Sequence, residues 1–118
     1  MIYTSYYSNY RNWPKDAKPV SISLYLPHYY KGERYVALAP PAFLLDDIRS
    51  DKIDEEAYAR EYSRVLVTLD PHRVASELDN CILLCYEKPP RFCHRYLVAK
   101  WLKDSGHEVQ EVPFKAKG

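Results

Sequence analysis

One stretch of the chain, Cys81-Ile-Leu-Leu-Cys-Tyr86, is apolar at every position and constrains the fold more than any other. A strand that is apolar on both faces is usually central in a parallel sheet, because other elements cover it on each side. A proline turn follows, then an amphipathic stretch over 92–104 and a β-prone stretch over 107–112. A strand, a helix and a parallel strand in this order form a right-handed crossover. The sequence therefore predicts a C-terminal β-α-β unit.

The remaining segments predict further strands and helices. Alternating Ser and apolar residues indicate a strand over 20–26, and a β-prone start covers 2–4. Helices are predicted over the ranges 42–49, 54–69 and 70–78, with Asp54 and Asp70 as N-caps of the last two. Together these elements predict an α/β fold, a single three-layer domain over 1–118 with a mostly parallel central sheet.

Composition limits the classes of partner. The formal net charge of the 118 residues is +1, so no general field attracts nucleic acid or a membrane, and any nucleic-acid contact would need a local basic patch. No apolar run approaches the roughly 18 residues of a membrane span. The start of the chain, Met1-Ile2-Tyr3, leads straight into polar sequence, and the cysteines number three. We therefore expect a cytoplasmic protein with reduced thiols and no membrane partner.

The segment from Cys85 to Arg95 holds most of the reactive side chains. It spans the end of the apolar strand, the turn and the helix start, which is where ligands gather in parallel sheets. At about 100° per residue, His94 falls at the centre of the helix's apolar stripe, with Cys93 and Arg95 on its borders. We predict that His94 is buried and hydrogen-bonded, and that it supports the site without acting as an exposed base.

Cys93 is the first candidate for chemistry. Unpaired N–H groups of a helix start, together with Arg91 and Arg95, favour a thiolate. Glu87 and Cys85 join Cys93 as candidate catalytic residues. The alternative is that Cys93 is a small buried residue at a helix–strand contact. In a reducing compartment, Cys85 and Cys93 are expected to remain unbonded.

Two other interpretations of these cysteines are weaker. Cys85 and Arg91 match the Cys-x5-Arg phosphate loop, but Pro89 and Pro90 remove two N–H donors and Glu87 adds a negative charge, so we reject it. Zinc is also possible through Cys85, Cys93 and His94, with a fourth ligand from His28, His72 or His107. The usual paired short spacings are absent, which argues against zinc.

Two segments of the chain resemble a known family. Leu83-Leu84-Cys85-Tyr86-Glu87-Lys88-Pro89 followed by Phe92-Cys93-His94-Arg95-Tyr96-Leu97-Val98-Ala99 is similar to the signature of domain-of-unknown-function family 488. The opening residues 2–9 resemble that family's first strand and Ser-Asn loop, and 35–40 resembles the Leu-Ala-Pro segment of its shorter subfamily. Many members carry a basic residue near 21–25, where this chain has no charge; if that residue helps to hold an anionic ligand, this chain has either lost the contact or replaced it with Arg11 or Lys31. The resemblance implies the fold and the place of the site, but no reaction.

A ligand site follows from these placements. If the first strand runs parallel to the apolar strand, Ser5, Ser8 and Asn9 reach the same edge as Glu87. The predicted ligand-binding residues are Ser5, Ser8, Asn9, Arg91, His94 and Arg95. Helix starts bind phosphates, and aromatic rings such as those of the loop with Tyr6, Tyr7, Tyr10 and Trp13 stack on bases. We therefore expect that the protein binds an anionic small molecule or nucleotide, or acts as an enzyme on a nucleotide or nucleic-acid component.

Two alternatives stay open. One is a thiol-dependent enzyme that uses Cys93 or Cys85. The other is a non-catalytic module in which Glu87, His94 and Arg95 form a buried polar network that fixes the turn. An open cleft over Glu87, Cys93 and Arg95 would favour ligand binding or thiol chemistry, whereas a sealed network would favour the structural role.

Overall fold

The structure, a computed structural model, describes residues 1–115 and contains a five-stranded, all-parallel sheet. Its strand order is β3-β2-β4-β1-β5. The strands are β1 (Ile2–Tyr6), β2 (Lys18–Ser21), β3 (Glu33–Arg34), β4 (Cys81–Cys85) and β5 (Val109–Glu111). Every residue of β4 is buried, and β4 lies at the centre between β2 and β1. The predicted central strand, the parallel β1 and the C-terminal β-α-β unit are therefore confirmed.

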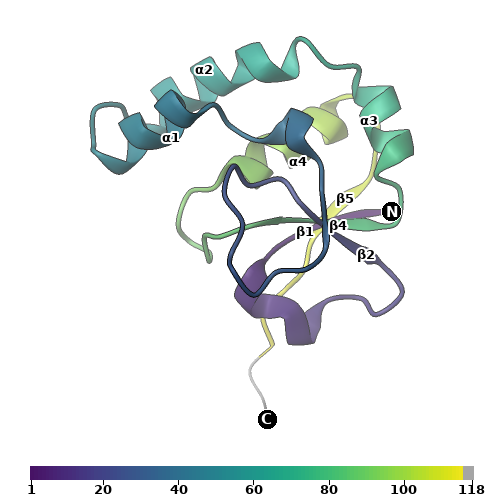
Figure 1. The fold of residues 1–118 in the computed structure, drawn as a ribbon. Helices are drawn as coiled ribbons and strands as arrows, with labels where there is room; N and C mark the ends of the chain where they lie inside the picture. The colour runs from purple at the N-terminus through teal and green to yellow at the C-terminus, as the bar shows by residue number, and fades with distance from the viewer. Residues whose placement is uncertain (116–118) are drawn as a thin grey trace.

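The direction of each crossover decides which face of the sheet it covers. The connections from β1 to β2 and from β2 to β3 run toward one side of the sheet, whereas those from β3 to β4 and from β4 to β5 run toward the other. Right-handed crossovers then place the first two on one face and the last two on the opposite face. Figure 1 shows this separation, with the α-helices on one side of the sheet and the first connection on the other.

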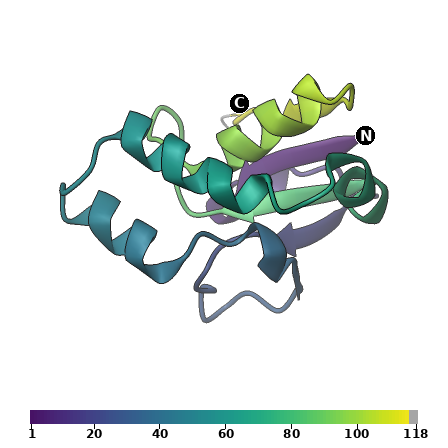
Figure 2. The ribbon, with the colours of Figure 1, turned by 90° about the horizontal axis from the view of Figure 1, so that it is seen from above.

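Four α-helices, all in the last two connections, cover one face of the sheet. They are α1 (Ala42–Arg49), α2 (Glu55–Leu66), α3 (Pro71–Glu77) and α4 (His94–Asp104). The side chains of Asp54 and Asp70 accept hydrogen bonds from the N–H groups of Ala57 and His72, so both predicted caps are confirmed. Helix α4 packs against β1, β4 and β5, while the hairpin of α1 and α2 extends beyond the carboxyl edge of the sheet (Figure 2).

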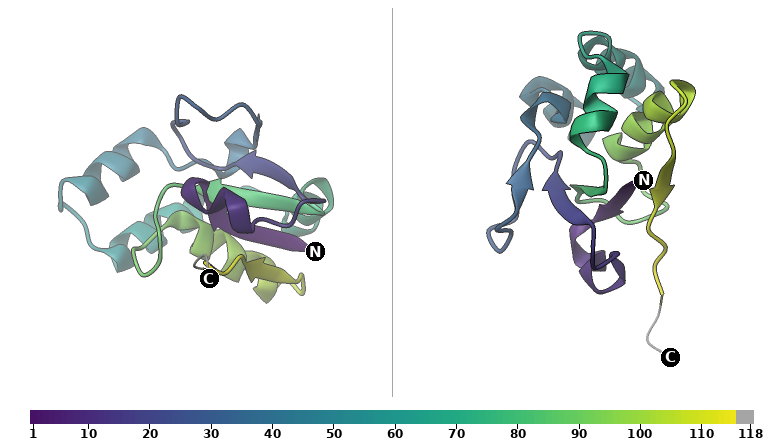
Figure 3. Two further views of the ribbon diagram at one scale, coloured as in Figure 1. Left: turned by 90° about the horizontal axis from the view of Figure 1, so that it is seen from below. Right: turned by 90° about the vertical axis from the view of Figure 1, so that its right-hand side faces the viewer.

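The opposite face is covered by irregular structure. The 3₁₀ helix η1 (Tyr7–Asn12) crosses the sheet there, as the view from below shows (Figure 3, left). Tyr7, Ala17, Ile82 and Leu84 form a small second core on this face, and the Tyr30 ring contacts the Tyr7 ring with centroids 5.4 Å apart. The third layer of the domain is thus a 3₁₀ helix and a loop, and not α-helices.

Several element boundaries differ from the sequence-based predictions. The second strand ends at Ser21 and does not reach 26, because the Ser21 hydroxyl accepts the N–H of Ser23 and turns the chain. The apolar residues that follow β3 form a second 3₁₀ helix, η2 (Val36–Leu38). Strand β3 was missed, since two charged residues at a sheet edge carry no apolar alternation. Helix α4 begins at His94, because Cys93 is extended and acts as its N-cap.

Within the described part of the chain, no helix has the length and apolar character that a membrane crossing requires.

Candidate functional site

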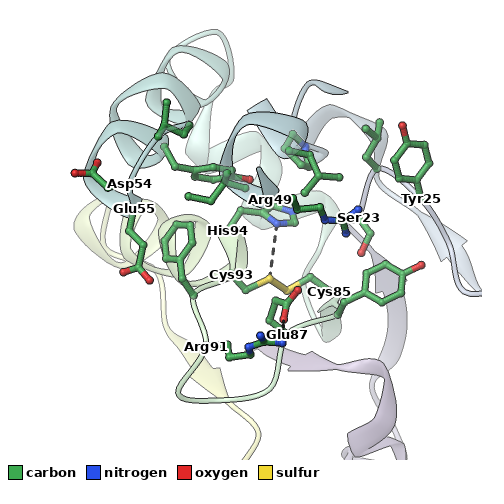
Figure 4. Close-up of a pocket in the computed structure, with 18 of the residues that line it drawn as sticks. Ser23, Tyr25, Arg49, Asp54, Glu55, Cys85, Glu87, Arg91, Cys93 and His94 are labelled. Atoms are coloured by element: carbon green, nitrogen blue, oxygen red, sulfur yellow. Dashed lines mark hydrogen bonds and ion pairs between the residues drawn. A yellow bond between two sulfur atoms is a disulfide. The ribbon is translucent and has the colours of Figure 1, made fainter. Parts of the chain in front are cut away.

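A cleft of about 650 Å³ opens at the carboxyl ends of β2 and β4. The α1–α2 hairpin forms one wall, and the loop from β4 to α4 forms the other (Figure 4). Of the residues predicted for the site, Cys85, Glu87, Arg91, Cys93 and His94 line this cleft. A volume of this size lies in the range of small-molecule sites, roughly 300–1,000 Å³. The predicted location beyond the strand ends is therefore a real cavity.

The two cysteines meet at the floor of the cleft. Cys85 is the last residue of β4, and Cys93 is the N-cap of α4, so the intervening turn folds back and brings their Cα atoms within 7.1 Å. Their sulfur atoms are joined as a disulfide (Figure 4). The prediction that this pair remains unbonded rested on a reducing compartment alone, and the structure contradicts it. The third cysteine, Cys81, is a free buried thiol at the other end of β4.

His94 lies beside this cysteine pair and is buried, as the apolar stripe predicted. Its Nε2 lies 2.7 Å from the carbonyl oxygen of Ile22, which can only accept a hydrogen bond, so Nε2 carries the proton. Its Nδ1 then faces the Sγ of Cys93 at 3.8 Å. Burial, aided by the nearby charge of Arg95, lowers the pKa of His94 to about 4 against the opposing hydrogen bond to Ile22. The prediction of a buried, hydrogen-bonded His94 is confirmed.

Arg95 faces away from the cleft and is fully buried, with 0% of its surface exposed. Its Nε and Nη2 donate to the Glu111 carboxylate at 3.0 and 2.9 Å. Its Nη1 donates to the carbonyl oxygen of Glu87 at 2.7 Å and to the Sγ of Cys85 at 2.9 Å. The guanidinium therefore ties β5, the turn and β4 together, and the structure does not place it in the cleft.

The predicted N-terminal ligands also lie outside the cleft. Ser5 of β1 and Asn9 of η1 are buried on the sheet face opposite the α-helices, and the Asn9 amide donates to the Ser5 hydroxyl at 3.2 Å. The Ser5 hydroxyl also accepts the Trp13 Nε1–H at 3.1 Å, and Asn9 donates to the carbonyl of Val112 at 3.3 Å. Ser8 is exposed on η1. These residues reach the expected edge of the sheet, but on the other face from Glu87, so they do not join the cleft residues in one crevice.

Glu87 and Arg91 form the lower rim of the cleft (Figure 4). Their side chains approach to 3.7 Å, with the Arg91 side chain 80% exposed. An exposed ion pair of this length is weak. Both groups are therefore available to a ligand.

Arg49 is the functional candidate that sequence reasoning missed. It belongs to the last turn of α1 and extends into the cleft toward Ser23, above the cysteine pair (Figure 4). Among residues 1–115 it forms neither an ion pair nor a hydrogen bond with another side chain. Burial raises the pKa of the Tyr86 hydroxyl, and the charge of Arg49 acts against that rise. No local pattern marked Arg49, because only the tertiary fold brings α1 over β4.

Ser23 and two aromatic residues complete the cleft. Ser23 is buried, and its hydroxyl lies 2.9 Å from the Tyr7 hydroxyl, which fixes it at the end of β2. The Tyr25 ring is exposed at the cleft mouth, on the side away from Glu55 (Figure 4), and Tyr86 is a second exposed aromatic residue that lines the cleft. The cleft thus offers aromatic surface, one unpaired guanidinium and several carboxylates.

One group of side chains could hold a metal ion. The Sγ atoms of Cys85 and Cys93 and one ring nitrogen of His94 all lie within 4.8 Å of one another. None of the fourth ligands proposed from sequence joins them: His72 and His107 bind each other at 2.9 Å near the start of the chain, and His28 lies outside this group.

Comparison with known proteins identifies the family. No curated protein matches the chain, and no solved structure matches it. A family model matches residues 6–106, which include the elements from η1 to α4 and the whole cleft. The chain therefore belongs to the DUF488-N3a family, described as the active DUF488-N3 subclade.

Proposed function

We propose that the protein binds an anionic small molecule that carries a planar ring, with nucleotides as the best-fitting class, in the cleft over Cys93 and His94. The observation that carries the proposal is the guanidinium of Arg49, which extends into a cleft of about 650 Å³ and has no carboxylate partner among residues 1–115. Arginine binds phosphate and carboxylate in a fixed, two-pronged geometry. The anionic group of the ligand is therefore assigned to Arg49.

A second cation supports the same end of the ligand. The pair of Arg91 and Glu87 is long, at 3.7 Å, so Arg91 can exchange that partner for the ligand's anionic group. The freed carboxylate of Glu87 then accepts hydrogen bonds from hydroxyl or amino groups of the ligand. This division of roles fits a molecule with both an anionic and a donor-rich part.

The aromatic side chains account for the planar part of the ligand. Tyr25 is 55% exposed and Tyr86 is 40% exposed, and both line the cleft. Stacking of a base on an exposed aromatic ring contributes about 1–3 kcal/mol. A nucleotide would satisfy the arginines and the tyrosines together, whereas inorganic phosphate would satisfy only the arginines.

A thiol reaction is the second candidate function. Arg95 donates a hydrogen bond to the Sγ of Cys85 at 2.9 Å, and such a contact favours thiolate over thiol once the disulfide is reduced. The description of the family as an active subclade agrees with chemistry at this site. Cys93, at the helix start and next to His94, is then the cysteine closer to a ligand in the cleft.

The binding proposal is tested by thermal unfolding with nucleoside monophosphates, the matching nucleosides and inorganic phosphate. We expect the monophosphates to raise the melting temperature most. Arg49→Gln should remove that rise, whereas Arg60→Gln, on an exposed part of α2 outside the cleft, should retain it. Equal stabilisation of both variants, or no stabilisation by any of these compounds in the unmodified protein, would contradict the proposal.

The thiol candidate is tested by alkylation of the reduced protein, followed by mass spectrometry. Cys85 should be modified at a lower pH than Cys81, which has no cationic donor on its sulfur. In an Arg95→Met variant that difference should disappear. If Cys85 and Cys81 show the same pH dependence in the unmodified protein, the guanidinium does not activate the sulfur.

A further inference from the structure

We propose that reduction converts the Cys85–Cys93 pair and His94 into a metal site for Zn²⁺ or a similar borderline-soft cation. The site goes beyond the proposed function, since binding of an anion by Arg49 requires no metal. Three protein ligands would hold the ion at the floor of the cleft, and the fourth position would face the cleft. This arrangement is typical of reactive zinc sites, whereas structural sites have four protein ligands.

The positions of the three ligand atoms support the site. The two sulfurs and the His94 nitrogen lie within 4.8 Å of one another, and all three residues are buried. The Cα atoms of Cys85 and Cys93 are 7.1 Å apart, whereas disulfides usually span about 4.4–6.8 Å. Two sulfurs bound to one zinc ion at about 2.3 Å each lie roughly 3.8 Å apart. A metal ion between them therefore suits the wider backbone separation.

The orientation of His94 is that of a metal ligand. Its Nε2–H donates to the carbonyl oxygen of Ile22 at 2.7 Å, which leaves the lone pair on Nδ1. That nitrogen faces the Sγ of Cys93 at 3.8 Å. A metal-binding histidine almost always donates its other ring N–H to a carbonyl or carboxylate, which fixes the ring and the tautomer. Ile22, just after β2, performs this role.

Arg95 provides the second outer contact. Its Nη1 donates to the Sγ of Cys85 at 2.9 Å, and its charge is balanced by Glu111 on the far side. Hydrogen bonds to a ligating sulfur stabilise the thiolate form and orient it. Two of the three proposed ligands thus already have the outer partners that a metal site needs.

The change from disulfide to metal site is balanced as follows. A dithiol reduces the Cys85–Cys93 bond by giving two electrons and two protons and becoming a disulfide itself; a phosphine gives the two electrons and becomes the phosphine oxide, with the oxygen and the two protons supplied by water. Zn²⁺ then binds both sulfurs and releases the two thiol protons, while neutral His94 adds its Nδ1 lone pair. A small-molecule disulfide can reverse the change: it takes two electrons from the two thiolates, is reduced to two thiols with two protons from water, and leaves the Cys85–Cys93 bond formed and the ion released.

The test uses Co²⁺, which absorbs visibly when sulfur binds it, and Zn²⁺ in competition. The full chain is reduced with a phosphine, desalted without oxygen and titrated. We expect one Co²⁺ per chain, sulfur-to-cobalt charge-transfer bands, and displacement by Zn²⁺. The oxidised protein should give no such bands. No bands in the reduced protein, or equal bands in the oxidised protein, would overturn the proposal.

Matched variants identify the ligands. Cys93→Ser should weaken binding by more than the roughly 10- to 100-fold loss seen for an outer-shell partner, and serine is itself a preferred N-cap, so α4 should still form. His94→Gln should weaken it as well. Cys81→Ser, at the opposite end of β4, should bind as the unmodified protein does. Binding that depends on Cys81 and not on Cys93 would assign the ion elsewhere.

A measurement without variants gives an independent answer. Zn²⁺ should raise the melting temperature of the reduced protein and leave that of the oxidised protein unchanged. Stabilisation by nucleotides is measured separately, on oxidised protein with a chelator present. If Zn²⁺ does not stabilise the reduced protein, stabilisation by nucleotides can still be observed, and the reverse also holds. The metal site and the Arg49 site are therefore tested separately.

Discussion

Arg49 and Arg95 both lie near the Cys85–Cys93 pair, but their surroundings are opposite. Arg95 is fully buried, and its donors are directed to Glu111, to the carbonyl of Glu87 and to the Sγ of Cys85. Arg49 is exposed in the cleft and has no side-chain partner among residues 1–115. The arginine of the sequence motif therefore builds the frame of the site, and an arginine outside the motif is available to a ligand.

The comparison separates two sides of helix α4. On the Arg95 side a polar network joins the guanidinium to Glu111, but it differs from the network that the non-catalytic interpretation predicted. Glu87 contributes only its carbonyl oxygen, and His94 is bonded elsewhere, to the carbonyl of Ile22. On the other side the cleft is open over Glu87, Cys93 and His94.

The largest effect is expected from removal of the buried guanidinium. Arg95→Met leaves the Glu111 carboxylate without its partner, and because that side chain is 29% exposed we expect a loss of about 3 kcal/mol of unfolding free energy, the lower end of the range for a broken buried pair. Urea denaturation measures the loss. The double variant Arg95→Met, Glu111→Leu should recover part of it. A loss no larger than that of Arg49→Gln would remove the distinction between the two arginines.

His94 lies between the two sides, and its pKa predicts the next effect. Burial lowers that pKa to about 4 in the folded protein, against about 6.5 in an unfolded chain. As the pH falls from about 6.5 to 4, the unfolded chain gains a proton that the folded chain does not bind, so the unfolding free energy should fall by about 3 kcal/mol. Above about pH 6.5, the contribution of neutral His94 to the unfolding free energy is fully present.

The measurement is denaturation of metal-free protein at several pH values, with His94→Gln as the comparison. The variant should be less stable at neutral pH, because glutamine fits the Ile22 carbonyl less well, but should lose less between pH 6.5 and 4. Parallel pH profiles for the two proteins would mean that His94 titrates normally.

A smaller effect is expected from the partner of Arg95. Glu111→Gln keeps an acceptor for the guanidinium and for the Thr4 hydroxyl, which lies 2.6 Å from Glu111, but removes the negative charge. The loss should be about 1 kcal/mol, the difference between charge-assisted and neutral hydrogen bonds. Urea denaturation measures it. A loss as large as that of Arg95→Met would show that the charge, and not the network, holds this side together.

The smallest effect on stability is expected at Arg49. Arg49→Gln should change the unfolding free energy by no more than about 0.5 kcal/mol, because an exposed side chain without partners contributes little. The same denaturation assay, without ligand, measures this change. A loss of several kcal/mol would give Arg49 a structural role and weaken its assignment as the anion-binding group.

Much of the fold and part of the site could be predicted from local sequence. The apolar run placed β4 at the centre of the sheet, and the caps Asp54 and Asp70 marked two helices. The helical stripe predicted a buried His94. Each of these depends on contacts within a few residues or on a simple period. Strand β3 and the early end of β2 could not be predicted, because a two-residue edge strand and a serine side chain that competes with the ladder leave no periodic signal.

The sequence alone determined two features of the site. It identified the residues that form the strand, turn and helix around Cys85 and Cys93, and it predicted that His94 faces inward. Only the tertiary structure decided which other residues lie near them. It turned Ser5 and Asn9 to the opposite face and placed Arg49 over the cysteines. The reason is the strand order: with right-handed crossovers, that order places η1 on one face and the α1–α2 hairpin on the other, and no local stretch of sequence carries that information.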